Sequence, residues 1–194
     1  THQPIVLIDD TKLPRSNYSS LRLSLASSGR SLTLYEIVYN KKKSKGYVRR
    51  VYKELLDNFE SMLPANCKPI FVSDAAFSEP FFKQLYIKGW GFVGRVRGLK
   101  NIKIGGGCFV RLKTLYKKAT TKPVHLGRGF LNKKQEHTIA GDFYLYKKLP
   151  KGRKAYTRSG RHSETDRSLR CAKSAKEPWV LFSSIDNLSA NEII

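Results

Sequence analysis

Apolar and polar positions follow regular patterns through the first half of the chain, and these patterns predict strands and helices in turn. Two apolar blocks, residues 4–8 and 69–72, are typical of buried strands, and each ends at an acidic residue. Residues 21–25 alternate leucine with polar side chains, the period of a strand with one buried face. A turn at residues 28–30 leads to a strand over residues 32–39, so we expect the first three strands to form an antiparallel meander.

Helical spacing of apolar residues appears twice. It predicts one helix over residues 48–62, which Pro64 ends, and a second over residues 77–88, with Gly89 at its C-terminal cap. A further strand follows over residues 90–96, which gives the order β-β-β-α-β-α-β. Four residues of the second helix are expected to face inward: Phe81, Phe82, Leu85 and Tyr86.

Each apolar block delivers a carboxylate at its carboxyl end: Asp9, followed directly by Asp10, and Asp74. An ionised acid beside an apolar strand is costly to desolvate unless it is solvated, paired or bound to a cation. Two such acids on neighbouring strands repel each other unless a divalent metal lies between them, and oxygen ligands favour Mg²⁺ or Mn²⁺. Asp9 and Asp10 point to opposite faces of a strand, so only one of them can meet Asp74. The structural alternative is that each acid starts a turn or caps a helix.

The charge of the chain predicts a polyanionic partner. Its 194 residues include 37 Lys and Arg against 15 Asp and Glu, a formal net charge of +22. Because the basic residues are spread over the whole length, we expect a folded surface that follows phosphates. A ribosomal or architectural protein would explain the charge as well, but it would not need apolar strands that end in paired acids.

The regular pattern is lost in the second half, which divides the chain into three parts. Residues 1–98 form the first part of a core, residues 99–178 a β-rich basic insertion, and residues 179–194 a return to the core. Within the insertion, residues 152–176 are rich in Arg, Lys and Ser, so they form a basic flap or are disordered without DNA. Three short runs have strand composition: residues 108–112, 124–128 and 143–146.

The three cysteines, Cys67, Cys108 and Cys171, are widely spaced and include no CxxC pair. We therefore expect reduced thiols in a cytosolic chain and no zinc site. No apolar run has the length of a membrane span or the features of a signal peptide, so no membrane partner is expected. The chain begins at Thr1 rather than Met, and we expect it to be a piece of a longer protein.

Several motifs, taken as a set from residue 5 to the end, resemble one enzyme family. They are Val6-Leu7-Ile8-Asp9-x-Thr11, the run GRSLTLYE from Gly29, Val72-Ser73-Asp74-Ala75-x-Phe77, Arg95-Val96-Arg97-Gly98, Lys151-Gly152-Arg153-Lys154 and the run SAKEPWVL from Ser174. The set resembles the DDE transposases of bacterial insertion sequences in the Tn-five and Tn-ten (insertion sequence four) family, and is most like the Tn-ten type.

The resemblance implies a ribonuclease H-like α/β fold, with a mixed sheet and a β-rich basic insertion before the last core strand. It also implies a metal-dependent DNA strand transferase with two Mg²⁺ (or Mn²⁺) ions in the complete site, which nicks DNA, forms hairpins and transfers strands at transposon ends. Asp9 and Asp74 take the catalytic, metal-binding places. Asp10 stands where the family has Trp, and it is the alternative to Asp9 as the first metal ligand.

The resemblance also implies residues that contact DNA. Arg95 and Arg97 match positions that face transposon-end DNA, the alternative being ordinary surface charge. Trp179 matches a Trp that stacks on a base flipped from the duplex, the alternative being core packing. The remaining DNA contacts implied by the motifs are Lys151, Arg153 and Lys154.

The third acid of the family is a Glu on a helix after the last strand, and this sequence stops at Ile194, before such a motif. We expect Glu177 to cap or pair near the strand start and Glu192 to lie in the first turn of a helix. The piece by itself is expected to bind metal weakly or not at all and to cleave no DNA. The implied partners are double-stranded DNA, as transposon ends and target, and a second copy in a homodimer of the full-length protein; the implied location is the bacterial cytoplasm, in association with the nucleoid.

Two other functions remain open from the sequence. A ribonuclease H-like nuclease or junction resolvase would share the fold and the metals, but it gives no reason for the long basic insertion. A non-catalytic DNA-binding module would need neither acid, so alanine at Asp9 and Asp74 would leave metal affinity unchanged.

Overall fold

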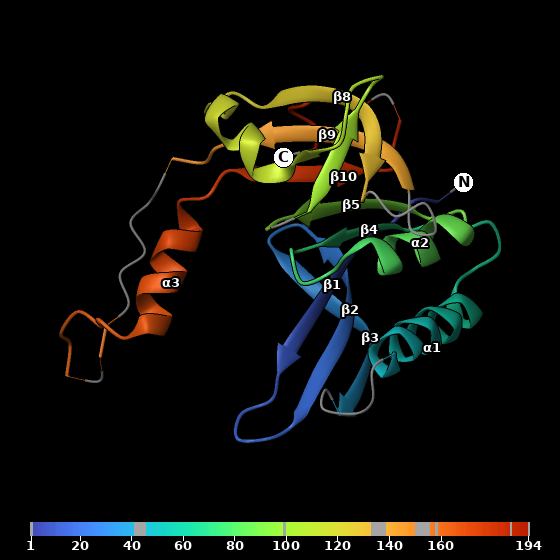
Figure 1. Cartoon of the computed structure of the whole chain (residues 1–194). Coiled ribbons are helices and arrows are strands. Elements are labelled where there is room, and N and C mark those ends of the chain that lie inside the picture. Colours follow the sequence, from blue (N-terminus) through green and yellow to red (C-terminus); the bar gives the residue numbers. More distant parts are fainter. Residues whose placement is uncertain are drawn as a thin grey trace.

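The computed structural model describes residues 2–40, 46–98, 100–132, 139–149, 156–157, 159–186 and 188–193. In these ranges the chain is a mixed α/β structure, with one ten-stranded sheet, three α-helices and one 3₁₀ helix. Two of the α-helices lie beside the first half of the sheet, and the third stands apart from it (Figure 1).

The first half of the chain confirms the predicted order β-β-β-α-β-α-β. Its elements are β1 (Ile5–Lys12), β2 (Tyr18–Ser27), β3 (Arg30–Asn40), α1 (Tyr47–Met62), β4 (Ile70–Ser73), α2 (Glu79–Ile87) and β5 (Gly91–Val96). β2 pairs antiparallel with both β1 and β3, so the predicted meander is also confirmed. Gly29 turns the chain between β2 and β3 at φ 71°, a conformation that suits glycine.

The strand order of the sheet is β3-β2-β1-β4-β5-β10-β9-β8-β6-β7. β1 and β4 are parallel, as are β4 and β5, whereas the other pairs are antiparallel. Parallel neighbours need a crossover connection, and α1 and α2 supply the two that are required here, before and after β4. As a result, the carboxyl ends of β1, β4 and β5 point the same way.

Aromatic side chains join the two helices to one face of the sheet. Tyr52 of α1 meets Phe81 of α2 with 5.5 Å between ring centroids, and Phe59 of α1 meets Phe71 of β4 at 6.0 Å. Phe82 of α2 stacks on Phe92 of β5, with 4.8 Å between ring centroids. The side chains of this face form the core, and the alternate residues of β1 and β4 therefore point to the opposite face.

Two residues that helical spacing would place inside are exposed. Met62 is 51% exposed and Tyr86, which was expected to face inward, is 61% exposed. Both lie in the last turn of their helices, and the buried stripes end before them, at Phe59 and Leu85. The C-terminal cap of α2 is as predicted, since Gly89 follows it at φ 66°.

The second half extends the same sheet. Its elements are β6 (Asn101–Ile104), β7 (Val110–Arg111), the 3₁₀ helix η1 (Leu112–Lys118), β8 (Val124–Leu131), β9 (Ile139–Tyr146), α3 (Asp166–Ala175) and β10 (Trp179–Ser183). β10 pairs with β5 on one side and with β9 on the other, so the strands of the expected insertion continue the core sheet. Phe143 of β9 and Phe182 of β10 join the common core, with ring centroids 4.8 Å apart.

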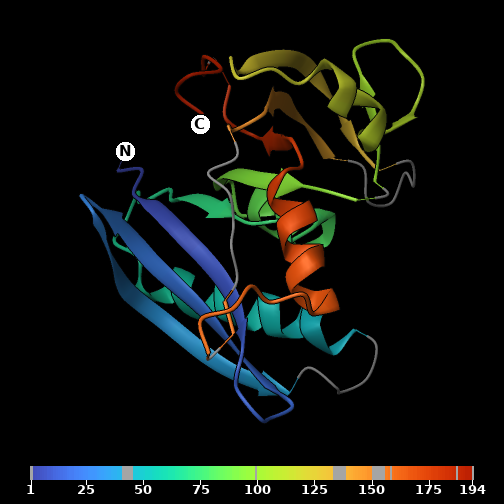
Figure 2. The same ribbon diagram turned by 90° about the vertical axis from the view of Figure 1, so that its left-hand side faces the viewer.

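Helix α3 lies within residues 152–176, for which the sequence predicted a flap or disorder and no helix. Its start has an ordinary cap, because Thr165 Oγ1 accepts a hydrogen bond from the Ser168 backbone N–H at 3.3 Å, and Asp166 lies in the first turn. Figure 2 shows this helix in front of the strands rather than packed among them.

Two further expectations concern cysteines and membranes. Cys67, Cys108 and Cys171 are free thiols, as predicted. Among the described residues, no helix combines the length and the apolar character needed to cross a bilayer.

Candidate active site

The parallel pairing of β1 with β4 brings two of the predicted acids to neighbouring positions. Ile8 lies in register with Ser73, so Asp9 and Asp74 occupy the next position on each strand path. Alternation along the strands puts Asp9 on the same face as Leu7, and Leu7 is in register with Val72. Both acids are exposed; Asp9 lies on the face of β1 opposite the core, and Asp74 lies just beyond the end of β4.

Asp10 points to the other face of β1. Its Oδ2 accepts a hydrogen bond from the Tyr39 hydroxyl at 2.9 Å, on the side of the core. Burial raises the pKa of Tyr39 far above its ordinary value, and the bond to Asp10 adds to this effect. Asp9, in contrast, is held by a local contact from the hydroxyl of Thr11, two residues further along the strand. Asp10 is therefore engaged in a hydrogen bond on the core side of β1, whereas Asp9 faces solvent.

Asp74 also makes the local contact that the structural alternative predicted. Its Oδ1 accepts a hydrogen bond from the Ala76 backbone N–H at 2.8 Å, the geometry of a turn that an Asp begins. It does not cap α2, because Ser78 holds that position. The turn fixes one carboxylate oxygen beyond the end of β4 and leaves the side chain at the surface.

Tyr52 of α1 lies within electrostatic reach of two of the acids. Burial raises the pKa of its phenol to about 12, and the negative charges of Asp10 and Asp74 act in the same direction. Negative charge from β1 and from the end of β4 is thus concentrated around one edge of the sheet. Helical spacing alone does not indicate that Tyr52 lies near these acids.

Arg95 of β5 lies next to this edge. Gly94 is in register with Ser73, so the following residue, Arg95, is the neighbour of Asp74. Its guanidinium lies over the Trp179 ring, 4.8 Å from the centroid, and burial lowers its pKa. Its Nε and Nη2 are buried, and no described residue accepts a hydrogen bond from them. The Arg95 guanidinium is therefore partly desolvated and is restrained by its contact with the Trp179 ring.

Arg97 and Trp179 complete the group around Arg95. Arg97 Nε donates to Glu177 Oε2 at 2.7 Å, so Glu177 pairs near the start of β10, as predicted. Trp179 is 36% exposed at the beginning of β10, so the alternative of core packing does not describe it. Arg97 is engaged in this ion pair, although its side chain is 35% exposed, whereas the guanidinium of Arg95 lies over the partly exposed Trp179 ring.

Tyr116 of η1 was not singled out from the sequence. Burial raises its pKa, and the charge of Glu177 acts in the same direction, while Arg95 and Arg97 oppose it. Its hydroxyl is buried and has no hydrogen-bond partner among the described residues. No sequence pattern identifies this tyrosine, because it approaches Arg95 only through the pairing of the second-half strands.

Of the remaining predicted residues, Glu192 is described by the structure and three others are not. Lys151, Arg153 and Lys154 are outside the described residues. Glu192 does not lie in a formed helix, but it accepts a hydrogen bond from the Ser189 backbone N–H at 2.8 Å, and its own N–H reaches Ser189 Oγ at 3.4 Å. This reciprocal pair is a capping box, the arrangement that opens a helix.

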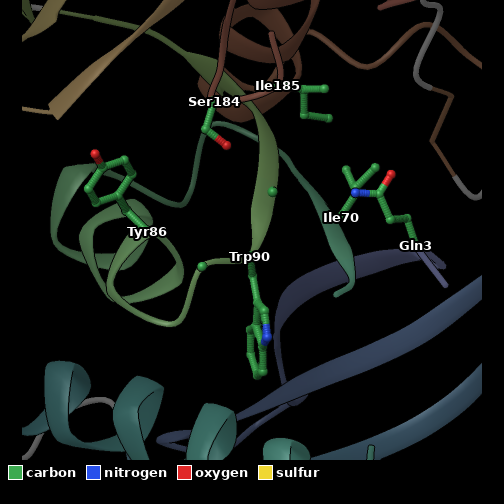
Figure 3. A pocket seen from close by; sticks show the side chains of 8 residues that line it. Gln3, Ile70, Tyr86, Trp90, Ser184 and Ile185 are labelled. Atoms are coloured by element: carbon green, nitrogen blue, oxygen red, sulfur yellow. The ribbon is translucent and has the colours of Figure 1, made fainter. Parts of the chain in front are cut away.

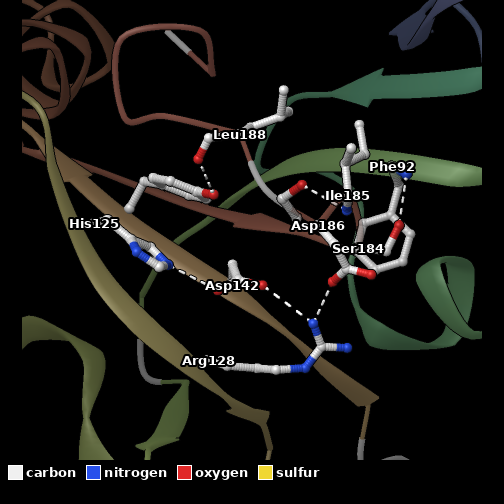
Figure 4. Close-up of polar contacts among 10 residues, drawn as sticks. Phe92, His125, Arg128, Asp142, Ser184, Ile185, Asp186 and Leu188 are labelled. Carbon is white, nitrogen blue, oxygen red and sulfur yellow. Dashed lines mark hydrogen bonds and ion pairs between the residues drawn. The ribbon is translucent and has the colours of Figure 1, made fainter.

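A second polar cluster lies on β8 and β9, away from the two acids (Figure 4). His125 Nε2 lies 2.7 Å from Asp142 Oδ1, and Arg128 bridges Asp142, at 3.4 Å, and Asp186. With Tyr144, which donates to the Leu188 carbonyl at 3.0 Å, they line an open groove of about 910 Å³. These contacts fasten the segment after β10 to the strands of the second half.

A shallow pocket of about 480 Å³ lies at the amino ends of β4 and β5 (Figure 3). Ile70, Tyr86, Trp90 and Ile185 are among the residues that line it. It is at the opposite end of these strands from Asp74 and Arg95, so it is not part of the candidate site.

Within the described ranges, no group of three or more His, Cys, Asp or Glu side chains is arranged to hold a metal ion. The candidate site consists of the pair Asp9 and Asp74, with the cation of Arg95 beside it. No family model matches the chain, and no curated protein matches it in sequence.

Proposed function

We propose that this chain is part of the catalytic domain of a DDE transposase, a metal-dependent DNA strand transferase with a ribonuclease H-like core. The order of elements in the first half and the adjacency of the first and fourth strands support this fold. The motifs around Asp9, Asp74 and Trp179 support the family. The net charge of +22 supports duplex DNA as the partner.

One observation carries the proposal. Asp9 and Asp74 follow the last in-register pair of two parallel strands, and both side chains are exposed. Neighbouring strands are about 4.8 Å apart, so two carboxylates in this relation can reach a shared cation. An acid with a purely structural role on one strand would not need a second acid at the end of the neighbouring strand.

The donor set fits the metal that the family uses. Two solvent-facing carboxylates are hard oxygen donors of the kind that Mg²⁺ and Mn²⁺ prefer. Asp9 and Asp74 would hold the metal, with Thr11 orienting the first carboxylate and the Ala76 N–H orienting the second. When bound, two such ions activate water or a 3′-hydroxyl and stabilise the leaving oxygen. Asp9 and Asp74 are two of the three acids of the family's complete site, and two carboxylates without the third are expected to bind metal weakly and to cleave no DNA strand.

The residues beside the acids are suited to the DNA strand. The guanidinium of Arg95 is held against the ring of Trp179 and placed next to Asp74, where a backbone phosphate would approach the metal. The exposed Trp179 ring offers a surface for an unstacked base. In the whole enzyme, Trp179→Ala is expected to slow hairpin formation more than the first nick; equal slowing of both steps contradicts the stacking role.

The metal site can be tested on this chain, because paramagnetic Mn²⁺ broadens nearby amide signals even when binding is weak. We expect low Mn²⁺ concentrations to broaden the amide signals of Thr11 and Ala76 first. Asp9→Asn and Asp74→Asn should each remove this selective broadening. Asp10→Asn is the matched control, since it makes the same charge change on the opposite face of β1.

Two results contradict the proposed site. If the broadening persists in both Asp9→Asn and Asp74→Asn, the acids do not hold the metal, and a DNA-binding module without catalysis becomes the better explanation. If Asp10→Asn removes the broadening instead, the first ligand is assigned to the wrong face of β1. A nuclease with the same fold predicts the same metal site, and strand transfer by the whole enzyme distinguishes the transposase from it.

A further inference from the structure

Helix α3 is exposed along its length. None of its described side chains is buried, and Leu169 is 56% exposed. Figure 1 shows the helix clear of the sheet and joined to it at one end through β10, and in Figure 2 it stands in front of the other elements. Its ten residues therefore gain little from tertiary packing.

A helix of this length is marginally stable in water without a partner, because forming its first turn is unfavourable and a short helix has few backbone hydrogen bonds to offset that free energy. The Thr165 cap and the acid in the first turn add about 1 kcal/mol each at most. A surface helix is ordinarily stabilised by packing an apolar side against the protein, and α3 does not bury its Leu169 in this way. The stability of the exposed helix α3 is therefore expected to depend on a binding partner.

Charge indicates the chemistry of the partner. Arg170, Lys173 and Lys176 recur every three positions, so they lie along one side of the helix and its last turn, and all are exposed. None of them forms an ion pair with another residue in the described ranges. A row of exposed cations that form no ion pair among the described residues matches the phosphates of a nucleic-acid backbone.

The carboxyl end of α3 is tied to the candidate active site. Glu177, two residues after the helix, accepts a charged hydrogen bond at 2.7 Å from Arg97, which directly follows β5. Trp179 follows, and its ring contacts the guanidinium of Arg95 at 4.8 Å from the centroid. Val180 pairs with Val96, so α3 leaves the sheet at the carboxyl end of β5, the end at which Arg95 neighbours Asp74.

We propose that α3 is a DNA-docking arm, in which Arg170, Lys173 and Lys176 contact the phosphate backbone of duplex DNA next to the acids. This inference rests on the proposed function for its partner. It adds Arg170 and Lys173, which precede the motif that begins at Ser174, and it proposes that this helix seats the duplex and is itself stabilised by it. Asp9 and Asp74 play no part in this contact, so the two proposals can fail separately.

The test measures duplex binding by the whole chain in EDTA, so that the metal site does not contribute. Removing one phosphate contact makes the slope of log K against log salt shallower by about 0.9 for duplex DNA. The double variant Arg170→Gln/Lys173→Gln should therefore reduce the magnitude of the slope by about 1.8. The matched control is Lys53→Gln/Lys68→Gln, which removes two exposed charges on α1 and before the amino end of β4 and should leave the slope unchanged.

Amide hydrogen exchange gives a second measure on the unaltered chain. Exchange of residues 166–175 should be fast without DNA and should slow by about tenfold or more when duplex DNA is added, because a bound helix opens less often. Because the variants change only exposed side chains on an unpacked helix, their thermal unfolding should match that of the parent chain.

Several outcomes overturn the docking arm. An unchanged slope in Arg170→Gln/Lys173→Gln, or an equal change in the control, shows that α3 does not contact phosphate, while the metal site is untouched by this result. Slow exchange of α3 that depends on protein concentration instead of DNA assigns the helix to a second copy of the chain. Absence of any duplex binding in EDTA also contradicts the arm.

Discussion

Glu79 joins the two halves of the sheet through a single buried carboxylate, and this leads to our principal stability prediction. It begins α2 and is 6% exposed. Its Oε2 accepts from Lys100 Nζ at 2.7 Å and its Oε1 from Asn132 Nδ2 at 2.7 Å. Lys100 precedes β6 and Asn132 follows β8, so both partners belong to the second half of the chain. Cutting this connection tests whether the two halves are one cooperative unit.

The two single substitutions should differ in cost because the partners differ in exposure. Lys100→Met leaves the buried carboxylate without its cation, and breaking a buried pair in this way costs about 3 kcal/mol or more. Glu79→Met leaves Lys100, whose side chain is 36% exposed and can turn to water, so we expect a cost of about 1–2 kcal/mol. The double substitution to Met replaces the pair by apolar groups and should cost less than Lys100→Met alone.

Urea unfolding followed by tryptophan fluorescence measures these differences, since Trp90 is 5% exposed and reports on the core. Lys53→Met is the matched control: its partner Asp57 is 40% exposed, and the loss of such a surface pair should cost less than about 0.5 kcal/mol. The reasoning is refuted if Lys100→Met costs no more than Lys53→Met. It is also refuted if the double variant costs the sum of the two single ones, because residues in one pair should couple.

Two further predictions concern the core and the titration of the site. Gly94→Ala places a Cβ 2.2 Å from the Phe82 ring and should destabilise by about 2 kcal/mol in thermal unfolding, whereas Gly106→Ala meets open space and should change stability by less than about 0.5 kcal/mol; equal effects would contradict the close packing. The Tyr52 phenol is neutral in the fold, with a pKa raised to about 12 from 10.0, so its stabilising effect is complete below pH 10 and is lost between pH 10 and 12. Asp74→Asn should lower the pKa of Tyr52 in an ultraviolet titration, and an unchanged pKa would place the two groups further apart than the structure does.

The fold of the first half could be predicted because its information is local. Hydrophobic period and turn residues determined the order of seven elements, and Gly89 marked the end of α2 as expected. The exposure of Met62 and Tyr86 could not be predicted, because it depends on where the sheet ends beneath each helix. Periodicity identifies a stripe of a helix, but it does not show how far the surface that covers it extends.

The fold of the second half was harder to predict from the sequence, because it depends on pairing between residues that are far apart in the chain. The sequence predicted short strands over residues 124–128 and 143–146, which lie within β8 and β9, but not that β10 would join them to β5. The contact between Glu79 and Asn132 spans 53 positions and the one between Arg97 and Glu177 spans 80. No local pattern marks the members of such pairs.

For the candidate site, the sequence identified Asp9, Asp10 and Asp74 as candidate acids, and the fold shows which of the first two lies on the exposed face of β1. Asp9 and Asp10 are equivalent in composition, and strand alternation alone predicted only that they face opposite ways. The structure adds that the face of Asp10 is occupied by Tyr39, while the face of Asp9 is open and adjoins the position of Asp74. Asp10→Asn therefore acts on the packing beneath the sheet, and Asp9→Asn acts on the charge above it.

Arg95 combines a partly buried guanidinium with a position next to Asp74. Its two guanidinium nitrogens without a hydrogen-bond partner among the described residues are covered, so the cost of desolvation lowers its pKa. The negative charge of Asp74 opposes this shift, and the Trp179 ring holds the guanidinium in place. An arginine held at this cost is already ordered before a phosphate arrives, so less side-chain entropy is lost on binding. Arg95→Lys keeps the charge but loses the planar stack, and it should therefore weaken duplex binding although the net charge is unchanged.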